Sequence, residues 1–165
     1  MKNNIQIKNA SMEDSECILQ LLREVARWIK EKGINQWGYL LSGGEDEEIL
    51  KDIVNKKTYI VFKDEQVIAT FNVSAEQNEW DKEIWGEDYS THSLYVHRLG
   101  VHPNYMKHGI GAYILNWIEE HFKNKYEYIK LDCVADNDKL NHFYQRHGYD
   151  LVETVDEYNK YQKKI

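Results

Sequence analysis

The chain has 165 residues, 42% of them hydrophobic, and a formal net charge of −7 at pH 7. This charge argues against general nucleic-acid binding, which needs a basic face, and no apolar stretch approaches the roughly 20 residues that cross a bilayer. We therefore expect one soluble, cytoplasmic domain over residues 1–165 with no nucleic-acid or membrane partner. The excess of acid suits a cationic small molecule, and it serves solubility in any case.

The N-terminal half predicts a strand, two helices and a hairpin. Ser11 with Asp14 forms a capping pattern before a run of apolar residues at helical spacing, and Gly33 ends that helix. Acidic residues open a second, short helix, where they complement the positive end of the helix dipole. The hairpin turns at Asp64 and Glu65. The predicted segments are a strand at 5–10, helices at 11–33 and 45–54, and two strands within 58–74.

The C-terminal half alternates strands and helices. Residues 75–93 contain six acids against one lysine and predict a long loop or ragged strand ends. The strand–helix–strand succession that follows requires a right-handed crossover and parallel strands, so we expect a mixed α/β sheet with helices on its faces. The predicted segments are strands at 93–101, 128–134, 149–155 and 158–164 and helices at 110–122 and 138–148.

Cys17 and Cys133 are the two cysteines of the chain. Two are too few for a disulfide framework, and neither has close cysteine or histidine partners with the spacing of a zinc site. We expect both to be buried thiols. No metal site is predicted.

Two glycines stand directly at the start of the helix at 110–122. The first turn of a helix has N–H groups without intrahelical partners, and glycine lets a ligand approach them without meeting a Cβ atom. Phosphate oxygens can therefore bind there with help from the helix dipole, although a tight turn or helix packing explains the glycines equally well. A Walker loop and a dinucleotide fingerprint are both excluded by the missing residues. The amides concerned belong to Lys107, His108, Gly109, Ile110, Gly111 and Ala112.

Two motifs resemble the GCN5-related N-acetyltransferase (GNAT) family. The first, "GVHPNYMKHGIGA", resembles the family's pyrophosphate motif, which follows a strand that ends in a Val-x-Pro turn. The second combines a strand ending at Val134 with Asn137, Phe143-Tyr144 and Gly148-Tyr149. One departure is Met106, which stands where the family usually has Arg or Gln; Lys107 and His108 are candidates to compensate.

The resemblance implies a single-domain GNAT-like fold, with a mixed central sheet and helices on both faces, and acetyl transfer from acetyl-CoA to a primary amine. A primary amine, with a pKa near 10.4, is about three units too protonated at neutral pH, which costs roughly 4 kcal/mol, so a general base is useful. Family positions for the base correspond to His97 and Tyr95. An imidazole is mostly neutral at this pH and is the better candidate, although a strand histidine with no catalytic role is equally plausible. Strand alternation places residues 95, 97, 99 and 101 on one face.

The remaining roles are implied by the same resemblance. Tyr144 would donate a proton or a hydrogen bond to the CoA sulfur, against the alternative of ordinary aromatic packing. Asn137 would bind the pantetheine arm, or else cap the helix that follows. The backbone of Leu99, Gly100 and Val101 would bond the pantetheine amides like an added strand.

The acceptor is the least defined part of the prediction. The family places it near the first two helices, which implicates aromatic residues that could hold a cationic amine by cation–π contacts. We expect a small polyamine-like or aminoglycoside-like acceptor. A peptide or protein acceptor, a non-catalytic acetyl-CoA sensor and an interaction module are alternatives, and a homodimer is possible. The candidate acceptor residues are Trp28, Trp37, Tyr39 and Tyr95.

Overall fold

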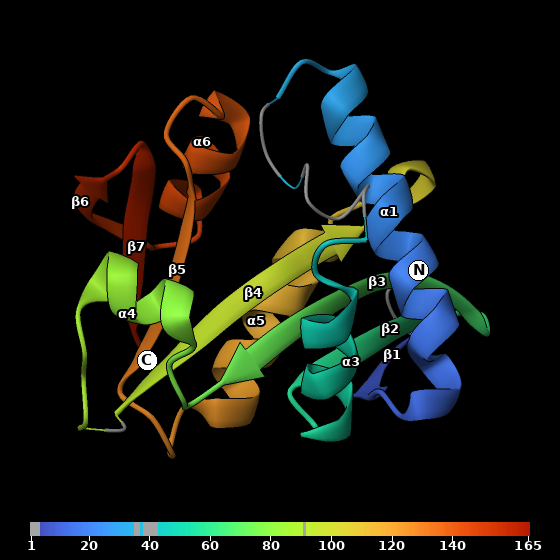
Figure 1. Cartoon of the computed structure of the whole chain (residues 1–165), viewed down its shortest axis with the longest axis horizontal. Helices are drawn as coiled ribbons and strands as arrows, with labels where there is room; N and C mark the ends of the chain where they lie inside the picture. Colours follow the sequence, from blue (N-terminus) through green and yellow to red (C-terminus); the bar gives the residue numbers. More distant parts are fainter. Residues whose placement is uncertain (1–3, 35–36, 38–42, 91) are drawn as a thin grey trace. The chain divides into compact units, whose positions relative to one another are not determined.

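The computed structural model describes residues 4–34, 37, 43–90 and 92–165. The described strands form a seven-stranded mixed sheet in the order β1-β2-β3-β4-β5-β7-β6 (Figure 1), which confirms the predicted α/β class. The strands are β1 (Ile5–Asn9), β2 (Thr58–Lys63), β3 (Gln66–Ser74), β4 (Ser93–Val101), β5 (Tyr128–Val134), β6 (Asp150–Val155) and β7 (Tyr158–Lys164). The helices are α1 (Ser15–Glu31), α3 (Asp46–Val54), α4 (Glu79–Trp85), α5 (Ile110–Phe122) and α6 (Asp138–Arg146), with short 3-10 turns at Met12–Asp14 and Pro103–Tyr105.

The chain divides into two compact units. Unit 1 comprises Met1–Val73 and His97–Gly111, and unit 2 comprises Ser74–Val96 and Ala112–Ile165. Strand β4 and helix α5 each contribute residues to both units.

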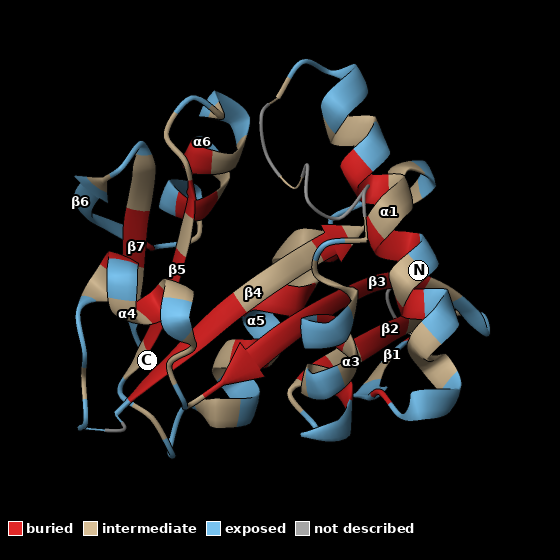
Figure 2. Cartoon of the chain, in the orientation of Figure 1, coloured by how far each residue is buried: buried red, intermediate tan, exposed pale blue. Residues whose placement is uncertain are grey.

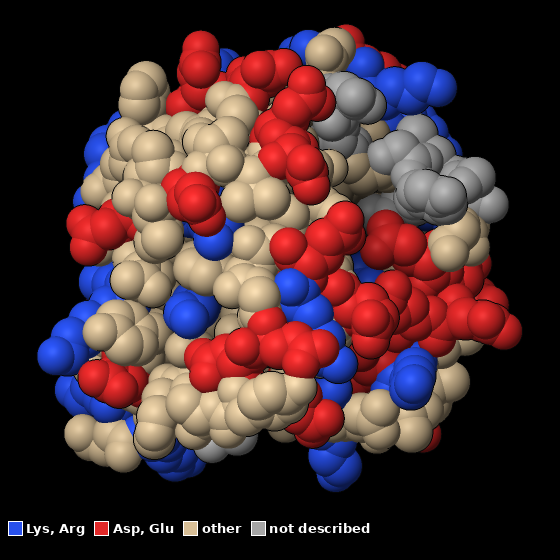
Figure 3. Space-filling model, turned by 60° about the vertical axis from the view of Figure 1, so that its left-hand side comes forward, with Lys and Arg blue, Asp and Glu red and all other residues tan. Residues whose placement is uncertain are grey.

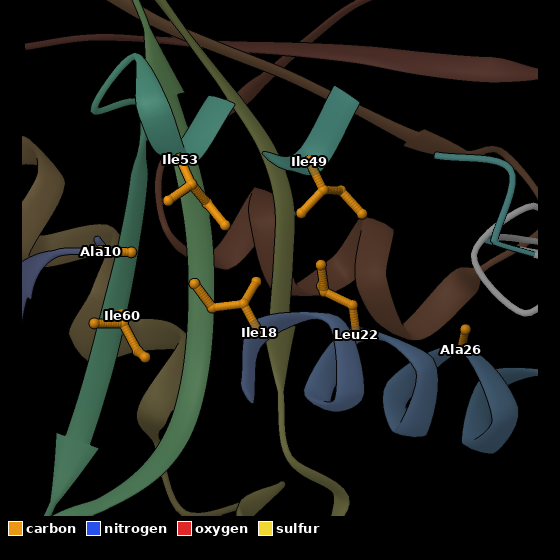
Figure 4. Close-up of a cluster of buried hydrophobic side chains, with 7 residues drawn as sticks. All are labelled: Ala10, Ile18, Leu22, Ala26, Ile49, Ile53 and Ile60. Carbon is orange, nitrogen blue, oxygen red and sulfur yellow. The ribbon is translucent and has the colours of Figure 1, made fainter. Parts of the chain in front are cut away.

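Unit 1 owes its core to α1 and α3. Ile18 and Leu22 of α1 point toward Ile49 and Ile53 of α3 (Figure 4), and together with Ile60 of β2 they form one buried apolar cluster. Strand β3 is buried along most of its length (Figure 2), as expected for a strand covered on both faces. The core therefore forms where the amphipathic face of each helix meets the sheet.

The predicted cap, helix stop and hairpin turn of unit 1 are present, but the Ser11 cap starts the 3-10 turn Met12–Asp14, and α1 itself begins at Ser15. The Ser11 N–H donates to Asp14 Oδ2 at 2.9 Å and caps the 3-10 turn that precedes α1. Gly33 has φ +76 just beyond the end of that helix. Asp64 and Glu65 have φ of +49 and +69, the left-handed pair that a two-residue hairpin turn requires.

Unit 2 has helices on both faces of its strands. The predicted parallel pairing of β4 with β5 is present, with Tyr95 opposite Lys130. Cys133 Sγ of β5 lies 3.5 Å from an oxygen of Asn141 in α6, whereas the neighbouring Asp132, which points to the other face, accepts a 3.1 Å hydrogen bond from Trp80 of α4. Helices α4 and α6 therefore cover opposite faces of β5.

Helix α4 corrects the prediction of a loop over residues 75–93. The Asp81 N–H donates to Asn78 Oδ1 at 2.8 Å, and the Asn78 N–H donates to Asp81 Oδ2 at 3.1 Å. This capping box starts the helix, Ile84 is buried beneath it, and Gly86 with φ +77 ends it. The Asn-x-x-Asp pattern was present in the sequence, but the high density of acids masked it.

Cys17 is also corrected, because it is exposed on α1, whereas Cys133 is buried as predicted. Only Ile18, Leu21, Leu22, Val25 and Ala26 of α1 are buried, and Cys17 lies outside that stripe. Among the described residues, no helix combines the length and the apolar character needed to cross a membrane.

Candidate functional site

The loop before α5 has the backbone geometry of an anion-binding nest. Lys107 and Gly109 have φ of +69 and +76, so neighbouring peptide N–H groups can converge. The first turn of α5 carries no acidic residue, and its N–H groups have no intrahelical partners. The His108 N–H is an exception among the predicted amides, since it donates to the Tyr105 carbonyl at 3.3 Å. An anion can therefore bind at the loop without meeting a competing carboxylate of that turn.

Side chains hold this loop in place from within unit 1. The His102 ring accepts a hydrogen bond from the Asn104 N–H at Nδ1, at 3.1 Å, so its proton is on Nε2, which lies 2.7 Å from Glu24 Oε2 of α1. The Tyr105 hydroxyl donates to Gln66 Oε1 at 2.7 Å. The loop is therefore anchored both to α1 and to the β2–β3 hairpin.

The backbone of β4 leaves extended geometry at Arg98, and this local bend is confined to one residue. This residue has φ +48, a conformation that costs a residue other than glycine about 1–3 kcal/mol. A left-handed residue interrupts the alternation of a strand. The expectation that residues 95, 97, 99 and 101 share one face is therefore wrong, because the regular alternation of side chains is interrupted at Arg98.

The Arg98 side chain is only 10% exposed and is surrounded by carboxylates. Nη1 lies 2.9 Å from Asp52 Oδ2, and Nη2 lies 3.3 Å from Glu45 Oε1 and 3.4 Å from Glu48 Oε2. Its Nε is buried without a hydrogen-bond partner among the described residues. No sequence pattern identified this cluster, because its members come from segments about 50 residues apart.

Gly100 lies against Trp37. A Cβ atom on Gly100 would be 3.1 Å from Trp37 Cη2 and 3.6 Å from a methyl group of Leu22. We predicted that this glycine lets pantetheine approach, but the nearest group in the structure is the indole. A residue predicted for the cofactor and one predicted for the acceptor are thus in contact within unit 1.

The other acceptor candidates differ in their surroundings. Trp28 is half-buried on α1, with Lys32 Nζ 5.4 Å from its ring centre. Tyr39 lies outside the described residues. Tyr95 is 2% exposed in unit 2, and its hydroxyl accepts a 3.1 Å hydrogen bond from Gln77. Burial, the largest cause, raises the pKa of Tyr95 to about 12, so the phenol stays protonated at neutral pH.

Tyr144 is a buried residue of α6. It is 6% exposed, and its ring lies 5.8 Å from the ring of Tyr161 and 5.9 Å from that of Tyr149. Burial, reinforced by the neighbouring Cys133, raises the pKa of the Tyr144 phenol above its ordinary value. The side chain thus keeps its proton over the physiological pH range.

Asn137 caps α6. Its Oδ1 accepts a hydrogen bond from the Leu140 N–H at 3.2 Å. The sequence left this capping role open beside a contact with pantetheine.

His97 is half-buried on β4, at the start of the second segment of unit 1. Unit 1 contains the predicted cofactor residues Leu99, Gly100, Val101, Lys107, His108, Gly109, Ile110 and Gly111. Unit 2 contains the predicted cofactor residues Ala112 and Asn137 and the predicted catalytic residue Tyr144.

A cavity of about 370 Å³ lies on the outer face of α1, opposite its buried stripe. Arg23 on this face pairs with Asp46 at 2.5 Å, and Glu24 pairs with His102. Its walls therefore present both cationic and anionic groups. The lining residues are Glu16, Leu19, Gln20, Arg23, Glu24 and Arg27.

Comparison with known proteins gives consistent results. The model of the acetyltransferase (GNAT) family matches residues 36–149. The chain is 38% identical over 159 residues to an uncharacterised N-acetyltransferase of Bacillus subtilis (strain 168), YesJ, and the match covers 94% of this chain and 88% of that protein. It is 24% identical over 140 residues to the S-(2-succino)cysteine N-acetyltransferase of the same organism, with 82% and 78% of the two chains covered.

A solved structure shows the same fold. The PaiA N-acetyltransferase of Thermoplasma acidophilum, determined in complex with coenzyme A, superimposes with a TM-score of 0.79 at 20% identity. The superposition covers 98% of this chain and 99% of that chain.

Proposed function

Because the chain belongs to the GNAT family of acetyltransferases, we propose that it transfers an acetyl group from acetyl-CoA to a primary amine of a small molecule. The enzyme class, N-acetyltransferase, follows from the family and from the named relatives. The observation that carries the proposal is the preformed loop at Lys107–Gly111. Lys107 and Gly109 have a left-handed backbone, and the first turn of α5 contains no acidic residue.

The loop fits the diphosphate of acetyl-CoA. The amides at the start of α5 and the helix dipole provide the positive end that a phosphate needs, and Lys107 and His108 are exposed beside them. Met106 offers no charge, but the anchoring of His102 and Tyr105 fixes the backbone before the ligand arrives. Pre-organisation of this kind lowers the cost of binding and compensates for the missing side chain.

When bound, acetyl-CoA supplies the acetyl group as a thioester. His97 would accept the proton that the acceptor amine loses when it attacks the thioester carbon and the thiolate leaves. Tyr144 would donate a hydrogen bond to the leaving sulfur. Because burial raises the pKa of Tyr144 and a thiol has a pKa of only about 8.5, Tyr144 stabilises the thiolate by a hydrogen bond rather than by full proton transfer.

A cationic acceptor, polyamine-like or aminoglycoside-like, is supported by the charge of unit 1. Helix α3 starts with Asp46, Glu47 and Glu48 directly after Glu45, and acidic side chains gather on the face shown in Figure 3. Carboxylates of this density raise the local concentration of a cation. Trp37, in the same unit, offers an aromatic face for cation–π contact.

An acceptor amine that also carries carboxylates is a second candidate. One relative acts, by its name, on S-(2-succino)cysteine, and Arg27 lines the α1 cavity. Guanidinium groups bind carboxylates through paired hydrogen bonds. The two candidates predict opposite preferences among acceptors, so one set of assays separates them.

The first test is calorimetric titration with acetyl-CoA. Gly109→Ala forces a Cβ atom onto a residue with φ +76, and Gly33→Ala does the same at the end of α1, where the added atom meets nothing within 4 Å. We expect Gly109→Ala to weaken acetyl-CoA binding by about tenfold or more and Gly33→Ala to leave it unchanged. Equal affinities in both variants would show that the loop is not the binding site.

The second test is thiol release with spermidine, an aminoglycoside, S-(2-succino)cysteine and a short peptide as acceptors. Tyr144→Phe should lower kcat and leave acetyl-CoA affinity near that of the wild type. Tight binding without turnover of any amine would favour the sensor alternative. Preference for S-(2-succino)cysteine over spermidine would favour the acidic acceptor.

A further inference from the structure

Arg98 combines two unfavourable features at one position of β4. Its backbone is left-handed, with φ +48, although arginine has no intrinsic tendency toward that region. Its side chain is also only 10% exposed, and the desolvation of a buried ion pair commonly cancels its Coulombic gain. Strain that persists only because its surroundings enforce it is concentrated at functional sites.

The surroundings of Arg98 hold the bend from several directions. Asp52 of α3 binds Nη1 at 2.9 Å and is itself held by Asn72 Nδ2 of β3 at 2.8 Å. Glu45 and Glu48 bind Nη2 from the start of α3. The guanidinium therefore has a fixed position, and the backbone that carries it must bend at one residue and in one direction.

The bend separates two groups to which the proposed function assigns roles. His97 directly precedes Arg98, and the peptide groups of Leu99–Val101 directly follow it. We propose that Arg98 is a positioning residue, which acts through its carboxylate anchor to set the direction of His97 relative to the peptide groups of Leu99–Val101. This inference rests on the proposed function.

Two substitutions remove the anchor and differ in the backbone conformation that the new residue favours. Arg98→Met removes the charge and keeps much of the volume. Arg98→Gly permits the left-handed backbone at no cost but no longer enforces it, so it lacks the backbone strain that Arg98→Met retains. Lys160→Met is the matched control, because Lys160 is also a buried cation, 8% exposed and 2.9 Å from Glu153, but it lies on β7 in unit 2.

We expect both Arg98 variants to bind acetyl-CoA about tenfold more weakly by calorimetry and to lose about 100-fold in kcat/KM, the effect of a displacement on the order of 1 Å at a reacting group. Circular dichroism should show that the variants measured are folded. Lys160→Met should retain wild-type affinity and kcat/KM.

Wild-type affinity and kcat/KM in folded Arg98→Gly would overturn the proposal, and a lower melting temperature in that variant would then mark a purely structural role. Failure of the wild type itself to bind acetyl-CoA would instead refute the proposed function. The two failures are therefore distinguishable.

Discussion

The side chain of Asn141 links α6 to the segment that precedes it, and its replacement by leucine tests how unit 2 is held together. Asn141 is 7% exposed. Its Nδ2 donates to the carbonyls of Val134, Ala135 and Asn137 at 3.2, 3.3 and 2.8 Å. Leucine has a similar shape, so Asn141→Leu removes these hydrogen bonds without opening a large cavity.

The magnitude follows from the groups left without a partner. Asn141 Oδ1 accepts hydrogen bonds from the Tyr161 hydroxyl at 2.5 Å and from Asn159 Nδ2 at 2.8 Å. The carbonyls of Val134 and Asn137 keep other backbone donors, so the Tyr161 hydroxyl, Asn159 Nδ2 and the Ala135 carbonyl lose their partner. At about 1–3 kcal/mol for each buried unpaired group, we expect a destabilisation of about 3 kcal/mol.

Urea unfolding followed by circular dichroism measures this loss, and a thermal scan should show a fall in Tm of about 6–12 °C, at about 2–4 °C per kcal/mol for a chain of this length. His142→Ala, one residue along α6 and exposed, is the control and should stay within about 0.5 kcal/mol of the wild type. A loss below about 1 kcal/mol in Asn141→Leu would show that the network is satisfied in another way and would refute this reasoning.

Three further predictions concern unit 2 and the cysteines. Asn78→Ala should destabilise the protein by about 1 kcal/mol in urea, because it removes the cap that binds the Asp81 N–H; no change would show that α4 adds nothing to stability. A thiol reagent at pH 8 should label Cys17 and spare Cys133 until the chain unfolds, because burial raises the pKa of Cys133 to about 12, and rapid labelling of both would contradict the described burial. The free energy of unfolding should fall as the pH rises above about 10, where the tyrosines of the unfolded chain ionise. The pKa of Tyr95 is raised to about 12 in the folded chain, so this phenol stays protonated there. Tyr95→Phe should make the fall less steep, and an unchanged slope would argue against this role of Tyr95.

The sequence by itself predicted the features that depend on neighbouring residues. The cap at Ser11, the hairpin turn at Asp64 and the glycines before α5 are all short-range patterns, because capping and turn formation involve residues at most four apart. The GNAT motifs were readable for the same reason, since each is a compact segment. The cap at Asn78 belongs to this class as well, although the acidic composition of residues 75–93 favours a loop.

Tertiary structure decided the features that join distant segments. Arg98 meets Glu45, Glu48 and Asp52 across about 50 residues of chain, and Trp37 lies on Gly100 across more than 60. Periodicity reports which face of a regular element is apolar, but it does not report where a strand leaves its regular conformation or which charge meets which. Such contacts depend on how the strands and helices pack, and at β4 that packing determines which peptide groups and side chains are available to the proposed chemistry.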